Sequence, residues 1–404
     1  MLKRIGVILL IALLIGSIQN CRTIDLTGLE GQEKEIFSEP LWVNYIDGDV
    51  YINQEKAEIN LPVVEGDVIK TTNEGRVEVG LDRNGFLWLN HNSEAVINFF
   101  NTTLVEISIN YGEIYIKTGQ RNIEIVTAKE KISLFEAGIY KIRLKDSFLV
   151  FHSYLRNEDR FDDFVRERLE QINQSLQEKL EFYGSWGYHP FYGAIWFPNV
   201  SPDWSPYLYG RWVWYPYWGW TWISYEPFGW LVFHYGRWQW HSSLGWYWIP
   251  NPFYWGPAWV YWYWWDSYIA WCPQWYDYSY YYHFYDFYQS PSRAWRIIRK
   301  DQLSRRDISK VVVNKNELVK RPSRFRINLN QIKENPNPQR VLNKSIYQKL
   351  QKNRIIKQKP PQSKSSISSP SLTSRTKSRI VKKETTRTRT TTKTKKIKKT
   401  KKKK

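Results

Sequence analysis

The sequence predicts a mainly β protein, in which an antiparallel β sandwich or roll precedes a tryptophan-rich repeat domain of antiparallel strands. Three features predict it: short runs of alternating apolar and polar residues between turns, an aromatic repeat with a 26-residue period, and one amphipathic segment between these regions. Alternation places the apolar side chains on one face of a strand. A fixed period indicates copies of one supersecondary unit.

Residues 1–20 have the order of a signal peptide. Two basic residues precede an apolar run from Ile5 to Ile18, which is shorter than the roughly 17–25 residues of a membrane-spanning helix. Cys21 follows, in an order that resembles a bacterial lipoprotein signal, and this resemblance implies that Cys21 is lipidated. Cleavage near Ser17 without lipidation and an uncleaved anchor stay open as alternatives. All three export the chain to the periplasm or outer membrane, and a lipid anchor would hold it at the membrane.

Residues 41–154 are predicted to form the antiparallel sandwich or roll. Apolar and polar residues alternate in segments such as Arg76–Leu81 and Leu104–Ile109, and Gly, Asn and Asp separate these segments into about ten short strands. Asn84-Gly85 is a residue pair typical of a type I′ hairpin turn.

The same residues contain Gly48-Asp49-Val50, Glu65 to Thr72, Val77-Glu78-Val79, Leu87-Trp88-Leu89, Gly112-Glu113-Ile114 and Glu136 to Tyr140. With these motifs, residues 41–154 resemble the FecR-like domain. That resemblance implies a periplasmic β domain, and the best known members of the family relay a transport signal to a sigma factor. The relay uses a cytoplasmic N-terminal segment and a transmembrane helix, whereas four residues precede the apolar run here. We therefore expect the fold without the relay, and a regulatory sensor of the envelope is the third functional hypothesis.

Residues 157–182 are predicted to form one amphipathic helix that links the two β regions. Apolar residues from Phe161 to Leu180 recur at steps of three and four, and charged residues occupy the other positions. Asn157 is a candidate N-cap. Packing against a flanking β domain and a separate interaction role are both open.

Residues 183–275 contain the repeat. Tyr-Gly-x-Trp begins at Tyr183, Tyr209 and Tyr235, and all but three of the 23 tryptophans lie between Trp186 and Trp275. We expect two strands in each 26-residue unit, followed by a closing piece that starts at Gly256. The block resembles a tryptophan-rich (Trp-x-x-Gly-x-Trp type) repeat family of unknown function that often follows a FecR-like domain in envelope proteins. This resemblance implies no catalytic residues.

Two interpretations of the tryptophans are open. In the first, the rings form the core of a thin sheet that has few aliphatic residues. In the second, some rings are exposed and form a platform for glycan or peptidoglycan. The two arginines among the candidates could meet an acidic sugar or a phosphate, or stack on a neighbouring tryptophan. The candidate ligand-binding residues are Trp212, Trp222, Trp238, Trp248, Arg211 and Arg237.

Residues 291–404 are predicted to be a disordered basic tail. They contain 37 Lys and Arg against 5 acidic residues, whereas the rest of the chain has 22 basic and 34 acidic residues. Few apolar residues are present, and Val311–Val313 is the one strand-like fragment. A polycation attracts polyanions irrespective of sequence, and behind an export signal we expect anionic envelope polymers or lipids rather than nucleic acid. A tail that serves only as a solvated extension is the alternative.

No motif indicates catalysis, a metal or a cofactor. The six histidines show no metal-binding spacing, and the chain has no nucleophile elbow and no glycine-rich phosphate loop. The two cysteines, Cys21 and Cys272, do not predict a disulfide framework. The sequence therefore favours a non-enzymatic structural or binding protein of the cell envelope, with a glycan-binding module as the second hypothesis.

Overall fold

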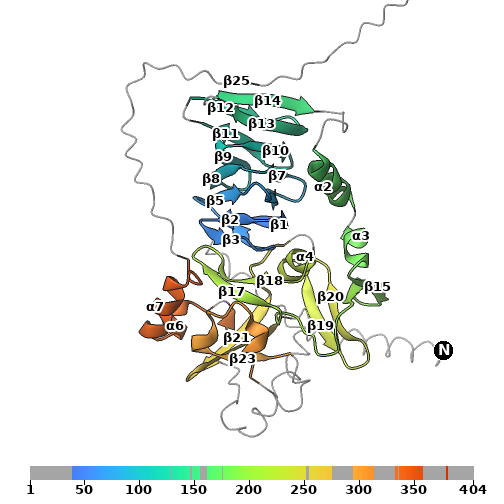
Figure 1. Ribbon diagram of the computed structural model, residues 1–404. Coiled ribbons are helices and arrows are strands. Elements are labelled where there is room, and N and C mark those ends of the chain that lie inside the picture. The colour runs from blue at the N-terminus through green and yellow to red at the C-terminus, as the bar shows by residue number, and fades with distance from the viewer. Residues whose placement is uncertain are drawn as a thin grey trace, which may run out of the picture. The chain divides into compact units, whose positions relative to one another are not determined.

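The computed structural model describes residues 39–357 and a two-residue strand at 379–380, with gaps at residue 128 and at 146–147, 155–161, 175, 252–253, 275–293, 314–332 and 335. The described part is mainly β, with antiparallel sheets and few helices, which confirms the predicted fold class (Figure 1). The signal peptide and Cys21 lie outside the described residues. Within the described ranges, no helix has both the length and the apolar character needed to cross a bilayer.

The described residues between Leu41 and Tyr154 contain fourteen strands, more than the roughly ten that alternation suggested. Three of them, β2, β3 and β4, are only two or three residues long. The strands are β1 Leu41–Asp47, β2 Val50–Ile52, β3 Glu55–Lys56, β4 Pro62–Val63, β5 Val68–Thr71, β6 Arg76–Gly80, β7 Phe86–Leu89, β8 Glu94–Phe100, β9 Leu104–Tyr111, β10 Glu113–Lys117, β11 Asn122–Val126, β12 Lys131–Leu134, β13 Ile139–Lys145 and β14 Phe148–Tyr154.

These strands form two sheets around one aliphatic core. The first has the order β14-β13-β10-β7-β6-β1-β4, and the second has the order β12-β11-β9-β8-β5-β2-β3, with β25 (Arg379–Ile380) beside β12. Pairing among the fourteen strands is antiparallel except between β9 and β11, which run parallel. Alternate residues such as Ile107 of β9 and Ile116 of β10 are fully buried in one hydrophobic cluster, as expected for a sandwich.

The Asn84-Gly85 pair joins β6 to β7 but does not form a type I′ turn. Neither residue has the positive φ that this turn requires. The carboxylate of Asp82 instead accepts hydrogen bonds from the backbone amides of Asn84 at 2.9 Å and Gly85 at 2.8 Å. Positive φ angles occur at Asn53 (50°) and Gln54 (70°), which connect β2 to β3.

The linking segment contains two helices, α2 (Asp163–Asn173) and α3 (Leu176–Glu181), where the sequence predicted one. Gln174 is extended and ends α2, while Asp162 caps its start by accepting a hydrogen bond from the Phe164 amide at 2.9 Å. The predicted cap, Asn157, lies outside the described residues. The apolar side of α2 packs on aromatic residues of the first sheet, which is the flanking-domain packing expected of an amphipathic helix.

Four hairpins follow, and the piece expected to close the repeats is the fourth. In each, the two tryptophans of the repeat face one another across the strands: Trp186 and Trp196, Trp212 and Trp222, Trp238 and Trp248, Trp262 and Trp271. The first three hairpins keep the same register at the 26-residue step. The hairpins are β15 Gly184–His189 with β16 Gly193–Pro198, β17 Gly210–Tyr215 with β18 Gly219–Ser224, β19 Arg237–His241 with β20 Gly245–Ile249, and β21 Val260–Trp265 with β22 Tyr268–Pro273.

The glycine of each Tyr-Gly-x-Trp motif is required by the tryptophan of the opposite strand. A Cβ on Gly210 would lie 2.6 Å from the ring of Trp222 and 2.3 Å from the carbonyl oxygen of Ile223. Gly184 meets the ring of Trp196 in the same way at 2.6 Å. The glycine recurs because the indole of the opposite strand packs directly against the backbone, where a Cβ atom would not fit.

The hairpins do not merge into one sheet. β16 pairs with β20, which joins the first and third hairpins, while β17 and β18 form a two-stranded sheet. The segments between hairpins also differ: Trp230 lies in helix α4 (Gly229–His234), whereas Trp204, its sequence equivalent, lies in a turn. The 26-residue period therefore describes the hairpins and not their connections.

Part of the predicted disordered tail is folded, so the boundary at residue 291 is wrong. β23 (Arg296–Arg299) extends the fourth hairpin, and β24 (Lys333–Glu334) pairs with its other edge. Two 3₁₀ turns, Lys300–Gln302 and Ile308–Lys310, and two helices, α6 Pro338–Val341 and α7 Lys344–Lys352, complete this C-terminal segment. Residues 311–313, the expected strand, are not one.

The hairpins, the C-terminal segment and one edge of the sandwich share a second, aromatic cluster. It includes Trp212 and Trp222 of the hairpins, Leu350 of α7 and Trp42 of β1. The Trp42 ring stacks on Trp230, with centroids 4.9 Å apart and planes 8° apart.

A buried asparagine strengthens this junction. The side-chain amide of Asn60 donates to the carbonyl oxygens of Ser224 at 3.1 Å and Glu226 at 3.0 Å, and its oxygen accepts from the Trp230 amide at 3.1 Å. Both N–H groups and the oxygen of one side chain are therefore directed at the hairpin region.

Candidate functional site

The four candidate tryptophans are core residues. Trp212 and Trp222 are fully buried, and Trp238 and Trp248 are each 1% exposed. The ring of Trp212 also lies 4.5 Å from that of Trp262, measured between centroids. The prediction that these rings form an exposed platform is wrong, and the other interpretation, in which they form the core, is confirmed. The physical reason is that the hairpins have few aliphatic side chains with which to exclude water, so the indoles do it.

Arg237 stacks on a tryptophan, which is one of the two roles the sequence allowed. Its guanidinium carbon lies 3.4 Å from the centroid of the Trp259 ring, and its Nη1 donates to the carbonyl oxygen of Gly236 at 2.9 Å. A guanidinium held in this way stabilises the connection between the third and fourth hairpins.

Arg211, at the equivalent position of the second hairpin, forms an ion pair instead. Its Nε donates to Oε2 of Glu58 at 2.8 Å, and Nη1 of Arg306 reaches Oε1 of the same carboxylate at 3.2 Å. Burial acts to lower the pKa of Arg211, but the charge and hydrogen bond of Glu58 outweigh it, so the pKa is raised. Arg211 therefore stays positively charged under all ordinary conditions.

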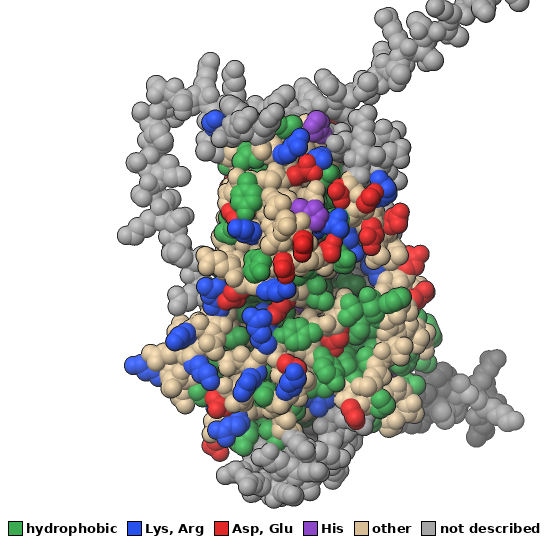
Figure 2. Space-filling view, in the orientation of Figure 1, with side chains coloured by type: hydrophobic (Ala, Val, Ile, Leu, Met, Phe, Trp, Pro, Cys, Tyr) green, Lys and Arg blue, Asp and Glu red, His purple; other side chains and the backbone are tan. Residues whose placement is uncertain are grey.

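Arg211 lines a pocket of about 290 Å³ that three distant segments of the chain form. The sandwich contributes residues from β2 to the start of β5, and the second hairpin contributes Arg211 and Tyr215. The C-terminal segment contributes Ser304 and Arg306, which lie between the two 3₁₀ turns, and residues that follow α7. Figure 2 shows Lys and Arg side chains gathered over the part of the molecule that Figure 1 labels β17, α6 and α7. Five basic and two acidic residues give the lining a positive excess: Lys56, Arg211, Arg306, Arg354 and Lys357 against Glu55 and Asp67.

Burial shifts two ionisable groups of this pocket in ways that disfavour their charged forms. It raises the pKa of Asp67, whose carboxylate accepts from the Val64 amide and from Asn53. It lowers the pKa of Lys357, an effect that Asp67 and Glu55 partly offset and that Arg211 and Arg354 reinforce. The pocket thus holds partly desolvated charges of both signs, and the arginines oppose the charging of Lys357.

A second surface presents exposed aromatic side chains at the tip of the first hairpin. Tyr188 is 79% exposed and Phe191 is 82% exposed. Next to Phe191, Tyr192 accepts a hydrogen bond from Nε2 of Gln239 at 3.2 Å, and the Tyr247 hydroxyl donates to Oε1 of the same glutamine at 2.7 Å. Figure 2 shows hydrophobic side chains over the part that Figure 1 labels α4, β15 and β20.

The sequence prediction chose rings that are buried, and alternation along the strands does not identify the exposed ones. Tyr247 lies between Trp246 and Trp248, and neighbouring residues of a strand point to opposite faces of its sheet. Tyr247 belongs to a separate small cluster with Ile195 and Ile249, away from the tryptophan core, but it is itself only 4% exposed. The exposed rings of Tyr188 and Phe191 lie at the tip of the first hairpin, which no periodicity in the sequence indicates.

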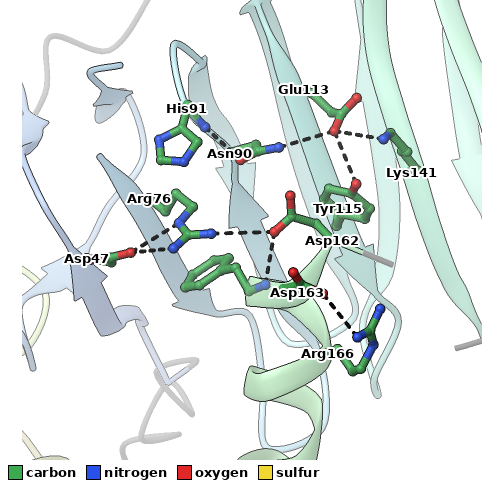
Figure 3. A network of polar contacts seen from close by, with 11 residues as sticks. Asp47, Arg76, Asn90, His91, Glu113, Tyr115, Lys141, Asp162, Asp163 and Arg166 are labelled. Atoms are coloured by element: carbon green, nitrogen blue, oxygen red, sulfur yellow. Dashed lines mark hydrogen bonds and ion pairs between the residues drawn. The ribbon is translucent and has the colours of Figure 1, made fainter. Parts of the chain in front are cut away.

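The polar residues near the start of α2 bind one another and hold this helix on the sandwich (Figure 3). Arg76 contacts Asp47 at 2.6 Å and Asp162 at 3.5 Å, and its guanidinium carbon lies 4.6 Å from the centroid of the Phe164 ring. Beneath α2, the buried carboxylate of Glu78 accepts two hydrogen bonds from Arg168, at 2.9 and 3.1 Å. Mutually satisfied groups of this kind fix the position of a helix.

A neighbouring group centres on Glu113 of β10 (Figure 3). Its Oε1 accepts from Asn90 at 3.3 Å and Tyr115 at 3.1 Å, and it pairs with Lys141 at 2.9 Å. Burial raises the pKa of Tyr115 to about 12, so its hydroxyl stays protonated. These contacts join β10 to β13 and to the residue that follows β7.

Burial shifts the pKa of other ionisable groups in the direction that favours their neutral forms. Burial lowers the pKa of His234 to about 4, and its Nδ1 donates to the carbonyl oxygen of Gly256 at 2.8 Å. Burial also raises the pKa of the Cys272 thiol and of Glu226, which accepts from the Trp204 indole at 2.9 Å. In the described ranges, no three His, Cys, Asp or Glu side chains cluster closely enough to hold a metal ion.

These features define a β sandwich joined to a domain of tryptophan-cored hairpins. Residues 177–278 match the model of a family of unknown function, DUF6600, and this range spans α3 and the four hairpins. The resemblance of this region to a tryptophan-rich family of unknown function is therefore confirmed. No curated protein and no solved structure matches the chain. No family model supports the FecR-like resemblance of residues 41–154, which stays a prediction.

Proposed function

We propose that the protein is a non-enzymatic structural or binding component of a bacterial cell envelope. In this proposal residues 1–20 export it, lipid on Cys21 anchors it, and a FecR-like sandwich carries the hairpin domain. The observation that supports a structural role most strongly is the burial of the repeated tryptophans, because the residues that distinguish this chain serve to hold it together. The basic residues of the C-terminal region would contact anionic envelope polymers or lipids.

The anchoring part of the proposal is tested by the mass of the mature N-terminus and by fractionation of Cys21→Ser. We expect the wild-type protein to carry a lipid on Cys21 and to sediment with membranes, and the variant to appear in the soluble fraction. Cys272→Ala is the matched control, because that cysteine is buried within the hairpin region. An unmodified Cys21, or a variant that sediments like the wild type, would contradict lipid anchoring.

Glycan or peptidoglycan binding is the second candidate, and the exposed rings at the tip of the first hairpin favour it. Flat aromatic side chains next to a hydrogen-bonded glutamine are the surface on which sugar rings stack. Co-sedimentation with peptidoglycan should fall in a variant that combines Tyr188→Ala and Phe191→Ala. It should not change in Phe135→Ala, which removes a ring that is 61% exposed on the sandwich. Equal co-sedimentation of all three proteins would remove this candidate.

A further inference from the structure

The pocket beside Arg211 has a cation that the described protein leaves without a bonded partner. Arg211 and Arg306 share the carboxylate of Glu58, and Arg354 pairs with Glu55 at 3.1 Å. In the part of the chain that the structure describes, no hydrogen bond or ion pair reaches the ammonium of Lys357.

Asp67 acts on Lys357 through its charge, and the described structure has no hydrogen bond between them. Oδ2 of Asp67 accepts from the Val64 amide at 2.8 Å, and Oδ1 accepts from Asn53 at 2.5 Å. Arg211 and Arg354 repel the same ammonium. A partly buried cation without a bonded partner is costly, and an anion from outside the chain would reduce that cost.

The geometry of the cations favours phosphate over a single carboxylate. Arg306 and Arg354 are 67% and 50% exposed at the side chain, and each uses one guanidinium nitrogen for its acidic partner. Both arginines and Lys357 line the same pocket, and a phosphate offers several acceptor oxygens in different directions. The volume of about 290 Å³ lies at the lower end of ligand pockets, which suits one sugar-sized unit rather than a length of polymer.

We propose that this pocket binds the phosphate group of a small organic phosphate ester, with Lys357, Arg354 and Arg306 as the donors. The site exists only when the sandwich, the second hairpin and the C-terminal segment are together, since each contributes lining residues. Binding would therefore also stabilise the association of these three segments. The proposal rests on the pocket alone and does not depend on export or on Cys21.

Calorimetric titration of the full-length protein with glycerol 3-phosphate tests this proposal. We expect binding at one site that weakens as NaCl is added, with glycerol inactive and acetate much weaker. Inorganic phosphate is a further probe: if it binds as tightly as the ester, free phosphate is the ligand source, and the phosphate site stands. No binding of either phosphate, or equal binding of acetate, would overturn the proposal.

Variants locate the site. Lys357→Gln and Arg354→Gln should each weaken binding about 10-fold or more, the effect of losing one charged hydrogen-bond donor. Lys310→Gln is the matched control, because Lys310 is 79% exposed at the side chain and does not line the pocket. Unchanged affinity in both pocket variants, with melting temperatures equal to that of the wild type, would place the phosphate elsewhere and reject the assignment.

Discussion

The sandwich and the hairpin region form their hydrophobic cores from different side chains. The sandwich buries alternating Ile, Val and Leu between two sheets of seven strands or more, and each strand depends on its neighbours. The hairpin region buries tryptophans, and its second hairpin forms a two-stranded sheet. A lone two-stranded hairpin is marginally stable in water. In the sandwich each strand is stabilised by further strands of its sheet, whereas in the hairpin region the stabilisation comes from contacts between the large rings of different hairpins.

The largest expected effect comes from removing one ring. Trp212→Ala should lower the free energy of unfolding by about 3–5 kcal/mol, because the ring contacts Trp222, Trp262 and Trp271 and leaves a cavity among them. Ile107→Ala, in the sandwich, should cost about 2–5 kcal/mol. Urea unfolding followed by tryptophan emission measures both.

The same pair of variants asks whether the two regions unfold together. Trp42 and Asn60 of the sandwich contact Trp230 of the hairpin region. We therefore expect Ile107→Ala, like Trp212→Ala, to lower the urea concentration at which the tryptophan emission changes. An emission transition in Ile107→Ala that coincides with the wild-type curve would show that the aliphatic and aromatic cores are independent.

A somewhat smaller effect tests whether the C-terminal segment completes the aromatic core. Leu350 is fully buried in that core, and Leu350→Ala should cost about 2–5 kcal/mol. The neighbouring Lys349 is exposed, and Lys349→Ala should stay within about 0.5 kcal/mol of the wild type. Thermal unfolding of the full-length protein compares them, and equal melting temperatures would remove α7 from the core.

The local features of the fold were predictable from the sequence. The Tyr-Gly-x-Trp period gives the register of the hairpins because its cause is a contact between adjacent strands, Gly210 under Trp222. Alternation likewise predicts strands such as β9, whose buried residues are every second one. The exposure of a ring was not predictable in this way. The spacing Trp212-x-Trp214 places both rings on one face of the strand, but it does not indicate which face packs on the core.

The parts that depend on distant residues were not predictable. Glu58 and Arg211 are 153 residues apart, and no pattern in either segment indicates that a pocket joins them. The C-terminal segment has few apolar residues, and Leu350 or Ile298 becomes a core residue only because the hairpins present an aromatic surface to it. Composition predicted disorder there because it counts the apolar residues of the segment and not those of its partner.

The smallest expected effect is a difference in stability between Phe variants of two equivalent tryptophans of the hairpin region. Trp222 and Trp248 hold the same place in their hairpins and both are buried. The Trp248 indole donates to the carbonyl oxygen of Tyr235 at 2.7 Å, whereas the buried Trp222 indole nitrogen has no hydrogen-bond partner in the described structure. Replacement by Phe removes similar volume from each site, but only Trp248→Phe also removes a hydrogen bond to a buried carbonyl.

We therefore expect Trp248→Phe to be less stable than Trp222→Phe by about 0.5–1.5 kcal/mol, the net contribution of one hydrogen bond. Urea unfolding with equal slopes in both variants gives the difference directly. If Trp222→Phe lost as much stability as Trp248→Phe, the Trp222 indole would have to contribute through a bonded group, such as an ordered water. Hydrogen bonding, and not ring volume alone, would then hold the second hairpin in place.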